Sequence, residues 1–253
     1  MRSVENPVQL DGALSLVIPV HNEVDNIAGV MRCSREALGL LTGDFEVVLV
    51  DDGCSDGTVE RARETLGADA DRLAVVKHGQ KLGYGISVAD GLRASRGDYV
   101  AFMDGDGQFD ARDLATLAAL LPRADLVGGW RIHREDPWHR SVVSGTFNVF
   151  VRLLYGIHYR DVDCGLKVMR REVLDAASPL LARAALLNTE LYFKAGRCGF
   201  RVAQVGIPHH RRLAGMRSGG RLIPILRAVR ELVRLRVRIA REWRPSTAHS
   251  MTR

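Results

Sequence analysis

Two aspartates separated by one glycine, Asp104 and Asp106, directly follow the apolar run 99–103. Strand side chains alternate, so both carboxylates project to the same side where that strand ends. Two hard oxygen ligands at this spacing suit Mg²⁺ or Mn²⁺, with diphosphate oxygens and water completing the coordination. An isolated Asp-x-Asp is also common in polar turns, so this interpretation depends on what the rest of the chain places nearby.

The elements around these acids predict an α/β fold. Short apolar runs without alternation indicate strands buried on both faces of a mostly parallel sheet, separated by helical stretches. Ligands of such sheets bind beyond the carboxyl ends of the strands, where this chain carries its polar clusters 21–23, 51–52, 81–85 and 104–106. Strands are expected at 14–20, 45–50, 73–76, 99–103, 125–130 and 201–207, and helices at 24–40, 56–66, 86–95, 112–121, 142–154 and 189–199.

Composition limits the class of protein. The 253 residues are 46% hydrophobic and 26% charged, as expected for a soluble globular chain. No segment offers the ~18 apolar residues that a membrane span needs, and residues 1–12 lack the apolar stretch of a signal peptide. The four cysteines show no metal-ligand spacing, which favours reduced thiols. A cytoplasmic protein, with at most peripheral membrane contact, is predicted.

Seven motifs, in order, resemble the family 2 glycosyltransferases with a GT-A type, Rossmann-like fold, and most closely the dolichol-phosphate (polyprenyl-phosphate) mannosyltransferases. The resemblance runs from about residue 14 to 218. It implies a glycosyltransferase domain over 1–220, with a nucleotide-sugar half at 14–130 and an acceptor half at 131–220. The motifs are VIPVHNE (17–23), VDDGCSDGT (50–58), KLGYG (81–85), GDYVAFMDGDGQ (97–108), DVDCGLK (161–167), TE (189–190) and RLAGMRS (212–218).

On the donor side, the resemblance assigns a nucleotide-sugar pocket and a metal. Asp104, Asp106 and Gln108 are the implied metal ligands, and Asp106 is also the first catalytic candidate. Carboxylates elsewhere in the pocket suit ribose hydroxyls and base N–H groups, while a glycine lets the backbone approach the nucleotide closely. The implied pocket residues are Pro19, Asn22, Glu23, Asp51, Asp52, Lys81, Gly83 and Asp104.

On the acceptor side, the resemblance implies a basic site for a phosphate. Arginine grips phosphate oxygens in pairs, and serine adds a hydroxyl donor. The candidates are Arg131, Arg140, Ser144, Arg212 and Ser218. Glu190 stands where many relatives place their catalytic carboxylate, as a general base or as a group that orients sugar or arginines. Asp161 and Lys167 are expected to organise the acceptor loop.

The predicted function is inverting, metal-dependent transfer of a hexose from a nucleotide-sugar to a polyprenyl phosphate at the cytoplasmic membrane face. The donor is GDP-mannose, UDP-glucose or a UDP-N-acetylhexosamine. The main alternative is transfer to a hydroxyl of a small molecule or glycan, which His21 and the missing proline after the metal motif favour. A nucleotidyltransferase lacks support because no glycine-rich phosphate loop follows the first strand. A degenerate binding module conflicts with the intact acids.

The positive charge of the chain belongs to one segment. Residues 221–244 hold eight arginines and two glutamates, a net +6 that equals the net charge of the whole chain. Apolar residues recur there at helical spacing, which predicts an amphipathic helix on an anionic membrane surface. The alternative is a terminal helix packed on the body. No nucleic-acid motif is present, residues 245–253 are expected to be disordered, and the sequence leaves open a membrane subunit or homo-oligomer.

Overall fold

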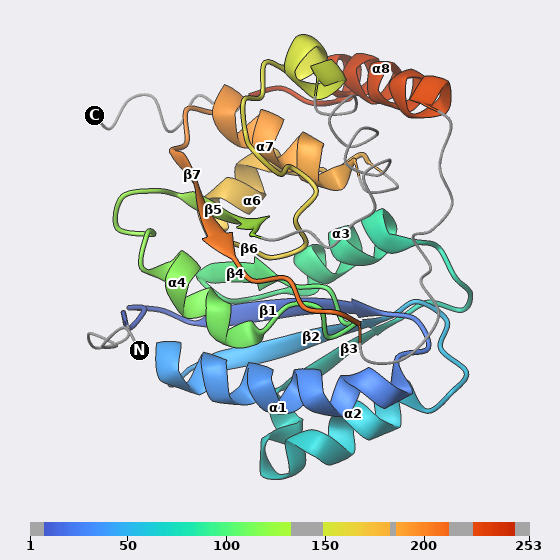
Figure 1. Cartoon of the computed structure of the whole chain (residues 1–253), viewed down its shortest axis with the longest axis vertical. Coiled ribbons are helices and arrows are strands. Elements are labelled where there is room, and N and C mark those ends of the chain that lie inside the picture. Colours follow the sequence, from blue (N-terminus) through green and yellow to red (C-terminus); the bar gives the residue numbers. More distant parts are fainter. Residues whose placement is uncertain (1–7, 133–148, 183–185, 213–224, 246–253) are drawn as a thin grey trace.

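The computed structural model describes residues 8–132, 149–182, 186–212 and 225–245. Within these ranges, seven strands form one sheet in the order β3-β2-β1-β4-β6-β5-β7 (Figure 1). The six expected strands are present, each within one residue of its predicted ends. The strands are β1 (Leu14–Val20), β2 (Phe45–Asp51), β3 (Leu73–Lys77), β4 (Tyr99–Phe102), β5 (Leu126–Arg131), β6 (Lys167–Arg170) and β7 (Val202–Ile207).

Strand β6 was not predicted, and it changes the sheet. β1 pairs in parallel with β2 and β4, and β2 pairs in parallel with β3. β6 lies between β4 and β5, antiparallel to both, while β7 runs parallel to β5. The sheet is therefore mixed but mostly parallel. The carboxyl ends of β1, β2 and β4 meet at one edge, where the strand order reverses and a ligand site is expected.

Helices cover both faces of the sheet (Figure 1). On one face lie α1, α2 and α4, and on the other lie α3, α6 and α7, with α8 outside α7. Among them α6 was not predicted. The bounds are α1 (Val24–Leu41), α2 (Thr58–Leu66), α3 (Tyr84–Ala94), α4 (Leu114–Ala118), α6 (Arg171–Ala177), α7 (Leu187–Arg197) and α8 (Ile225–Glu242), with short 3₁₀ turns η1 (Gly67–Arg72) and η2 (Ala111–Asp113).

Strand β1 shows why the apolar runs lack alternation. Leu16 and Ile18 pack into the core beneath α1, α2 and α4, whereas Val17 packs into the core beneath α3 and α7. All three side chains are fully buried. A strand with helices on both faces needs apolar residues at consecutive positions, and this need produces the sequence pattern.

The helix expected at 142–154 is seen over residues 149–155, and its first part lies outside the described residues. The predicted tail segment forms α8, while residues 246–253 lie outside the described ranges. In the part of the chain that the structure describes, none of the helices combines the length and apolarity of a membrane span.

Candidate active site

Asp104 lies just beyond β4 in a tight, acidic environment. Burial and the neighbouring Asp106 raise the pKa of Asp104 to about 6, although the Tyr84 hydroxyl donates a hydrogen bond to it. A β-carbon at Gly165 would lie 2.1 Å from Asp104 Oδ2, so only glycine lets this loop approach the carboxylate. Asp104 Oδ1 is buried and has no hydrogen-bond partner among the described residues. Such an atom calls for a cation or another donor.

Asp106 faces the same region from the following turn. Its Oδ1 accepts a hydrogen bond from the Gln108 backbone amide at 3.1 Å, and its Oδ2 lies 3.9 Å from Arg212 Nη1. The Gln108 side-chain amide donates to the His210 carbonyl at 3.1 Å. His209 packs edge-on against Phe109 with ring centroids 5.0 Å apart. The segment after β7 thus lies against the metal motif.

These residues fit a divalent cation that is shared with a diphosphate. The described residues contain no group of three or more His, Cys, Asp or Glu side chains that could hold a metal ion by themselves. Mg²⁺ commonly takes only one or two carboxylates and completes its shell with phosphate and water. The unpartnered Asp104 oxygen and the raised pKa of Asp104 agree with a site that a cation would stabilise.

Arg212, predicted to bind the acceptor phosphate, contacts two acids that were predicted on the nucleotide-sugar side. Its guanidinium pairs with the Glu23 carboxylate as well as lying near Asp106. Glu23 occupies the N-cap position of α1 without a side-chain capping hydrogen bond, and its Oε2 accepts from the Asn26 side chain at 2.8 Å. One arginine from the segment after β7 therefore links the loop after β1 with the loop after β4. This arrangement places a positive charge beside Asp106 and Glu23.

The loops after β1 and β2 hold each other in place. Asn22 has a positive φ of 56°, and its side-chain oxygen accepts from the Ser55 amide at 2.9 Å. Asp51, the last residue of β2, accepts from the Cys54 amide at 2.6 Å. Pro19 lies in β1 opposite Val50 of β2. Three predicted pocket residues are thus brought together at one edge of the sheet.

Asp52 shapes the next predicted loop. Its Oδ1 accepts from the Leu82 amide at 2.7 Å, and its Oδ2 accepts from the Gly83 amide at 2.9 Å. Burial disfavours the charged carboxylate, but hydrogen bonds from His78 and these amides outweigh it and lower the pKa of Asp52. Gly83 has a φ of 99°, which favours glycine, and Lys81 is exposed beside it. In these contacts Asp52 positions the 81–83 loop.

His78 was not identified from the sequence, and it supports Asp52. Its Nδ1 lies 2.9 Å from Asp52 Oδ1, and its Nε2 lies 3.3 Å from Asp90 Oδ2 on α3. The ring is buried. The ring therefore lies between the loop after β2 and helix α3, with its hydrogen bond made to Asp52.

We expect His78→Leu to reduce the free energy of unfolding by about 2 kcal/mol, because the buried Asp52 carboxylate loses its side-chain hydrogen bond. The loosened 81–83 loop should raise KM for the nucleotide-sugar more than it lowers kcat. Urea unfolding and donor titration check both effects. Arg93→Ala on α3 is the control, since Arg93 pairs with Asp90 at the surface. Equal changes in the two variants would contradict a positioning role for His78.

Arg131, a predicted acceptor residue, is already paired. Its guanidinium binds Asp161 through two hydrogen bonds of 2.7 and 2.8 Å. Burial opposes the charge of Arg131, but Asp161 outweighs it and raises the pKa of the guanidinium. Lys167 is fully buried and donates to the Val162 and Cys164 carbonyls. Asp161 and Lys167 therefore fix the 161–166 loop. Gly165 of this loop packs against Asp104.

Glu190 lies in α7 in a fully buried ion pair. Its carboxylate accepts from the Leu181 amide at 2.8 Å and the Ala182 amide at 2.6 Å, and lies 2.6 Å from Lys194 Nζ. Lys194 also donates to the Ala177 and Pro179 carbonyls. These contacts hold the loop before α7. Both carboxylate oxygens have structural partners, so the role of Glu190 as a general base stays a prediction.

We expect Glu190→Gln to reduce the free energy of unfolding by about 3 kcal/mol, because Lys194 is left as an unpaired buried charge. Transfer by the folded protein should stay near the wild-type rate, whereas loss of a general base costs about 10²–10⁴-fold. Urea unfolding measures the loss of stability, and transfer assays at low temperature measure the rate of the folded protein. The double variant Glu190→Gln/Lys194→Met should recover stability. A folded Glu190→Gln protein without activity would restore the base interpretation.

Three predicted acceptor residues, Arg140, Ser144 and Ser218, lie outside the described residues. The sequence analysis missed two residues that contact acids of the site, Tyr84 beside Asp104 and His78 beside Asp52. The Tyr84 hydroxyl contacts Asp104, and burial together with that carboxylate raises the pKa of Tyr84. Its position inside the KLGYG motif was a signal for it. His78 offered none, because a lone histidine after a strand is unremarkable in sequence.

Comparison with known proteins agrees with this geometry. The sequence profile described as "Glycosyl transferase family 2" matches residues 15–177, which include every acid at the ends of β1, β2 and β4. The chain belongs to glycosyltransferase family 2. The resemblance inferred from the seven motifs is thereby confirmed.

Relatives of this family 2 chain include enzymes named for lipid-phosphate acceptors. It is 31% identical over 164 residues to the undecaprenyl-phosphate 4-deoxy-4-formamido-L-arabinose transferase of Aeromonas hydrophila, covering 64% of this chain and 50% of that protein. It is 28% identical over 227 residues to the dodecaprenyl-phosphate galacturonate synthase of Rhizobium johnstonii, covering 87% and 65%. The chain thus spans about half to two thirds of these relatives.

A solved structure confirms the GT-A type fold. The glucosyl-3-phosphoglycerate synthase of Mycobacterium tuberculosis, in complex with Mn²⁺, UDP and glucosyl-3-phosphoglycerate, superposes with a TM-score of 0.65. The match covers 91% of this glycosyltransferase chain and 80% of the other, at 20% sequence identity. At this identity the likeness concerns the fold alone.

Proposed function

We propose that this glycosyltransferase moves a hexose from a nucleotide-sugar to the phosphate of a polyprenyl phosphate, with inversion at the anomeric carbon. The observation that carries the proposal is the Asp104–Asp106 pair at the end of β4, with Arg212 beside it. The names of the two relatives support a lipid-phosphate acceptor. GDP-mannose, UDP-glucose and UDP-N-acetylhexosamines are the donors to test.

The reaction requires little from the protein beyond positioning and charge. A phosphate monoester has a second pKa of about 6, so the acceptor is ionised near neutral pH and needs no base. An acceptor oxygen forms a bond to the anomeric carbon, and the bond from that carbon to the nucleotide diphosphate breaks, its electron pair leaving with the diphosphate. A Mg²⁺ or Mn²⁺ ion held by Asp104 and Asp106, with Gln108 as a third predicted ligand, would neutralise charge on the leaving group.

The chain's own residues have separate tasks in this scheme. Pro19, Asn22, Glu23 and Asp51 line the nucleotide side, and Asp52 positions the loop of Lys81 and Gly83. Arg212 screens the two phosphates from each other, because it already lies between Glu23 and Asp106. The Glu190 contacts agree with an acceptor that needs no deprotonation. The proposed location is the cytoplasmic membrane face, with peripheral attachment.

The test is transfer of radiolabel from each nucleotide-sugar to polyprenyl phosphate in detergent, with Mg²⁺ or Mn²⁺. Label should enter the solvent-extractable lipid from one donor, and the unphosphorylated polyprenol should receive none. Transfer to the polyprenol, or to a water-soluble hydroxyl acceptor alone, would favour the alternative hydroxyl reaction. Absence of lipid-bound label from every donor would overturn the proposal.

A further inference from the structure

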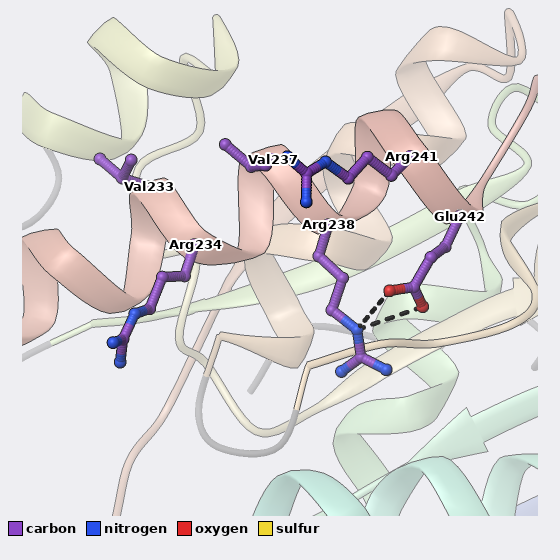
Figure 2. Close-up of a pocket in the computed structure, with 6 residues that line it drawn as sticks. All are labelled: Val233, Arg234, Val237, Arg238, Arg241 and Glu242. Carbon is purple, nitrogen blue, oxygen red and sulfur yellow. Dashed lines mark hydrogen bonds and ion pairs between the residues drawn. The ribbon is translucent and has the colours of Figure 1, made fainter.

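Helix α8 is apolar on two sides. One side packs on the body: Leu232, Leu235 and Ile239 are buried in the same core as α7, and Trp243 follows them. At Leu232, Leu235 and Ile239 the apolar stripe is therefore covered by the protein itself. The helix nevertheless exposes two further large apolar side chains, Val233 at 43% and Val237 at 44%. Figure 2 shows both projecting from one edge of the helix.

The arginines of α8 divide into two groups. Arg236 stacks over the Phe193 ring, and Arg238 donates to the Leu181 carbonyl and pairs with Glu242, so these two lie toward the body. Arg230, Arg234 and Arg241 are exposed and recur at intervals of four and seven, which places them on one side of the helix. At about 100° per residue, that side lies opposite the buried stripe and directly beside Val233 and Val237.

We define the outer face of α8 as Arg230, Val233, Arg234, Val237 and Arg241. Four of these residues line a pocket together with Arg238 and Glu242 (Figure 2). The volume of this pocket is about 310 Å³.

The helix over residues 149–155 extends this exposed apolar character. The Tyr155 hydroxyl donates to the Leu232 carbonyl at 2.8 Å, which fixes the end of this helix against α8. Both helices lie at the same end of the molecule (Figure 1). Leu153 is 74% exposed and Val149 is 52% exposed, and Arg152 lies between them. Four of the six large apolar side chains exposed in the described residues belong to these two helices.

We propose that the outer face of α8, continued by Val149 and Leu153, docks this protein on an anionic lipid bilayer. The proposal rests on the proposed function, because a lipid-linked acceptor would lie in that bilayer. The valines enter the boundary between headgroups and acyl chains, and the arginines bind lipid phosphates. The buried stripe keeps α8 fixed to the catalytic body during contact.

The character of the side chains favours lipid over other partners. Single-stranded nucleic acid is held by aromatic stacking, and every large apolar side chain exposed in the described residues is aliphatic. Charge complementarity is strong, since residues 221–244 carry the net positive charge of the chain. Aliphatic residues bordered by arginines suit an anionic surface, and the exposed Glu242 carboxylate beside them is paired with Arg238.

The test is flotation of the full chain with vesicles of neutral phosphatidylcholine, with or without anionic phosphatidylglycerol, lacking polyprenyl phosphate and donor. Binding should require the anionic lipid and should weaken as salt rises. Val233→Ser/Val237→Ser and Arg234→Glu/Arg241→Glu should each reduce partitioning by roughly tenfold. The matched controls, Leu40→Ser on α1 and Arg61→Glu/Arg63→Glu on α2, remove equivalent exposed groups from the opposite side of the sheet and should bind normally.

Each outcome decides a separate question. Equal binding by wild type and both α8 variants, binding to neutral vesicles alone, or no binding by the wild type would overturn the docking surface. Binding of a polyuridine RNA without vesicle binding would point to nucleic acid and overturn it too. Transfer to polyprenyl phosphate in detergent without vesicle binding would leave the proposed function intact. Vesicle binding without transfer from any donor would support the docking surface and overturn the proposed function.

Discussion

Asp106→Asn should reduce sugar transfer by about 10³-fold while leaving the protein folded, because the substitution removes a negative charge from the proposed metal–diphosphate site. The asparagine oxygen can still accept the hydrogen bond from the Gln108 amide, so the turn after β4 keeps its shape. Radiolabel transfer over a Mg²⁺ and Mn²⁺ titration measures the effect.

Asp44→Asn is the matched control for this substitution. Asp44 is exposed in the loop before β2, at the opposite end of the sheet from Asp106. It should lose no activity. If Asp106→Asn kept a rate close to that of Asp44→Asn, the assignment of Asp106 as a metal ligand would be wrong.

Asp104→Asn should lose activity to a similar degree but should stabilise the free protein. The folded-state pKa of Asp104 is about 6, above its ordinary value of 3.8. Above pH 6 the charged carboxylate therefore costs folding free energy, up to about 3 kcal/mol for a shift of this size. That cost fades as pH falls from about 6 toward 4, and asparagine avoids it altogether.

The measurement is urea unfolding of wild type and Asp104→Asn at several pH values without metal. The stability gain of the variant should be largest at pH 7–8 and smallest near pH 4. Metal and donor affinity of the wild type should change in the opposite direction to stability, weakening as Asp104 takes up a proton below about pH 6. A variant less stable than wild type at pH 8 would show that the charged Asp104 carboxylate does not destabilise the folded protein.

The sequence predicted the strands well because helices on both faces demand uninterrupted apolar runs. β1 matches its expected bounds of Leu14–Val20 at both ends. β6 escaped prediction because it is four residues long and begins with Lys167, a charged residue that is fully buried here. Its strand character arises from pairing with β4 and β5, which local sequence does not encode.

The site was predictable in its location but not in its pairings. Strand-end acids must gather at one edge of a parallel sheet, and Asp51, Asp52, Asp104 and Asp106 follow that rule. The ion pairs join segments that are far apart in the sequence, as in the Arg131–Asp161 and Arg212–Glu23 pairs. Glu190 and Lys194 resemble an ordinary surface pair at spacing i, i+4, yet both are fully buried. Their burial follows from the packing of α7 beneath α8, which the sequence spacing does not indicate.

The position of β5 limits how this enzyme can be re-engineered. β5 belongs to the half of the chain expected to bind the nucleotide-sugar, yet its strand partners, β6 and β7, both come from the acceptor half. The Asp125–Arg201 ion pair, with a 3.0 Å contact, adds a further link between the halves. A chimera that joined the first half of this chain to the second half of a relative would have to rebuild the pairings of β5 with β6 and β7. Donor and acceptor preference should therefore be exchanged through loops, not by recombining halves.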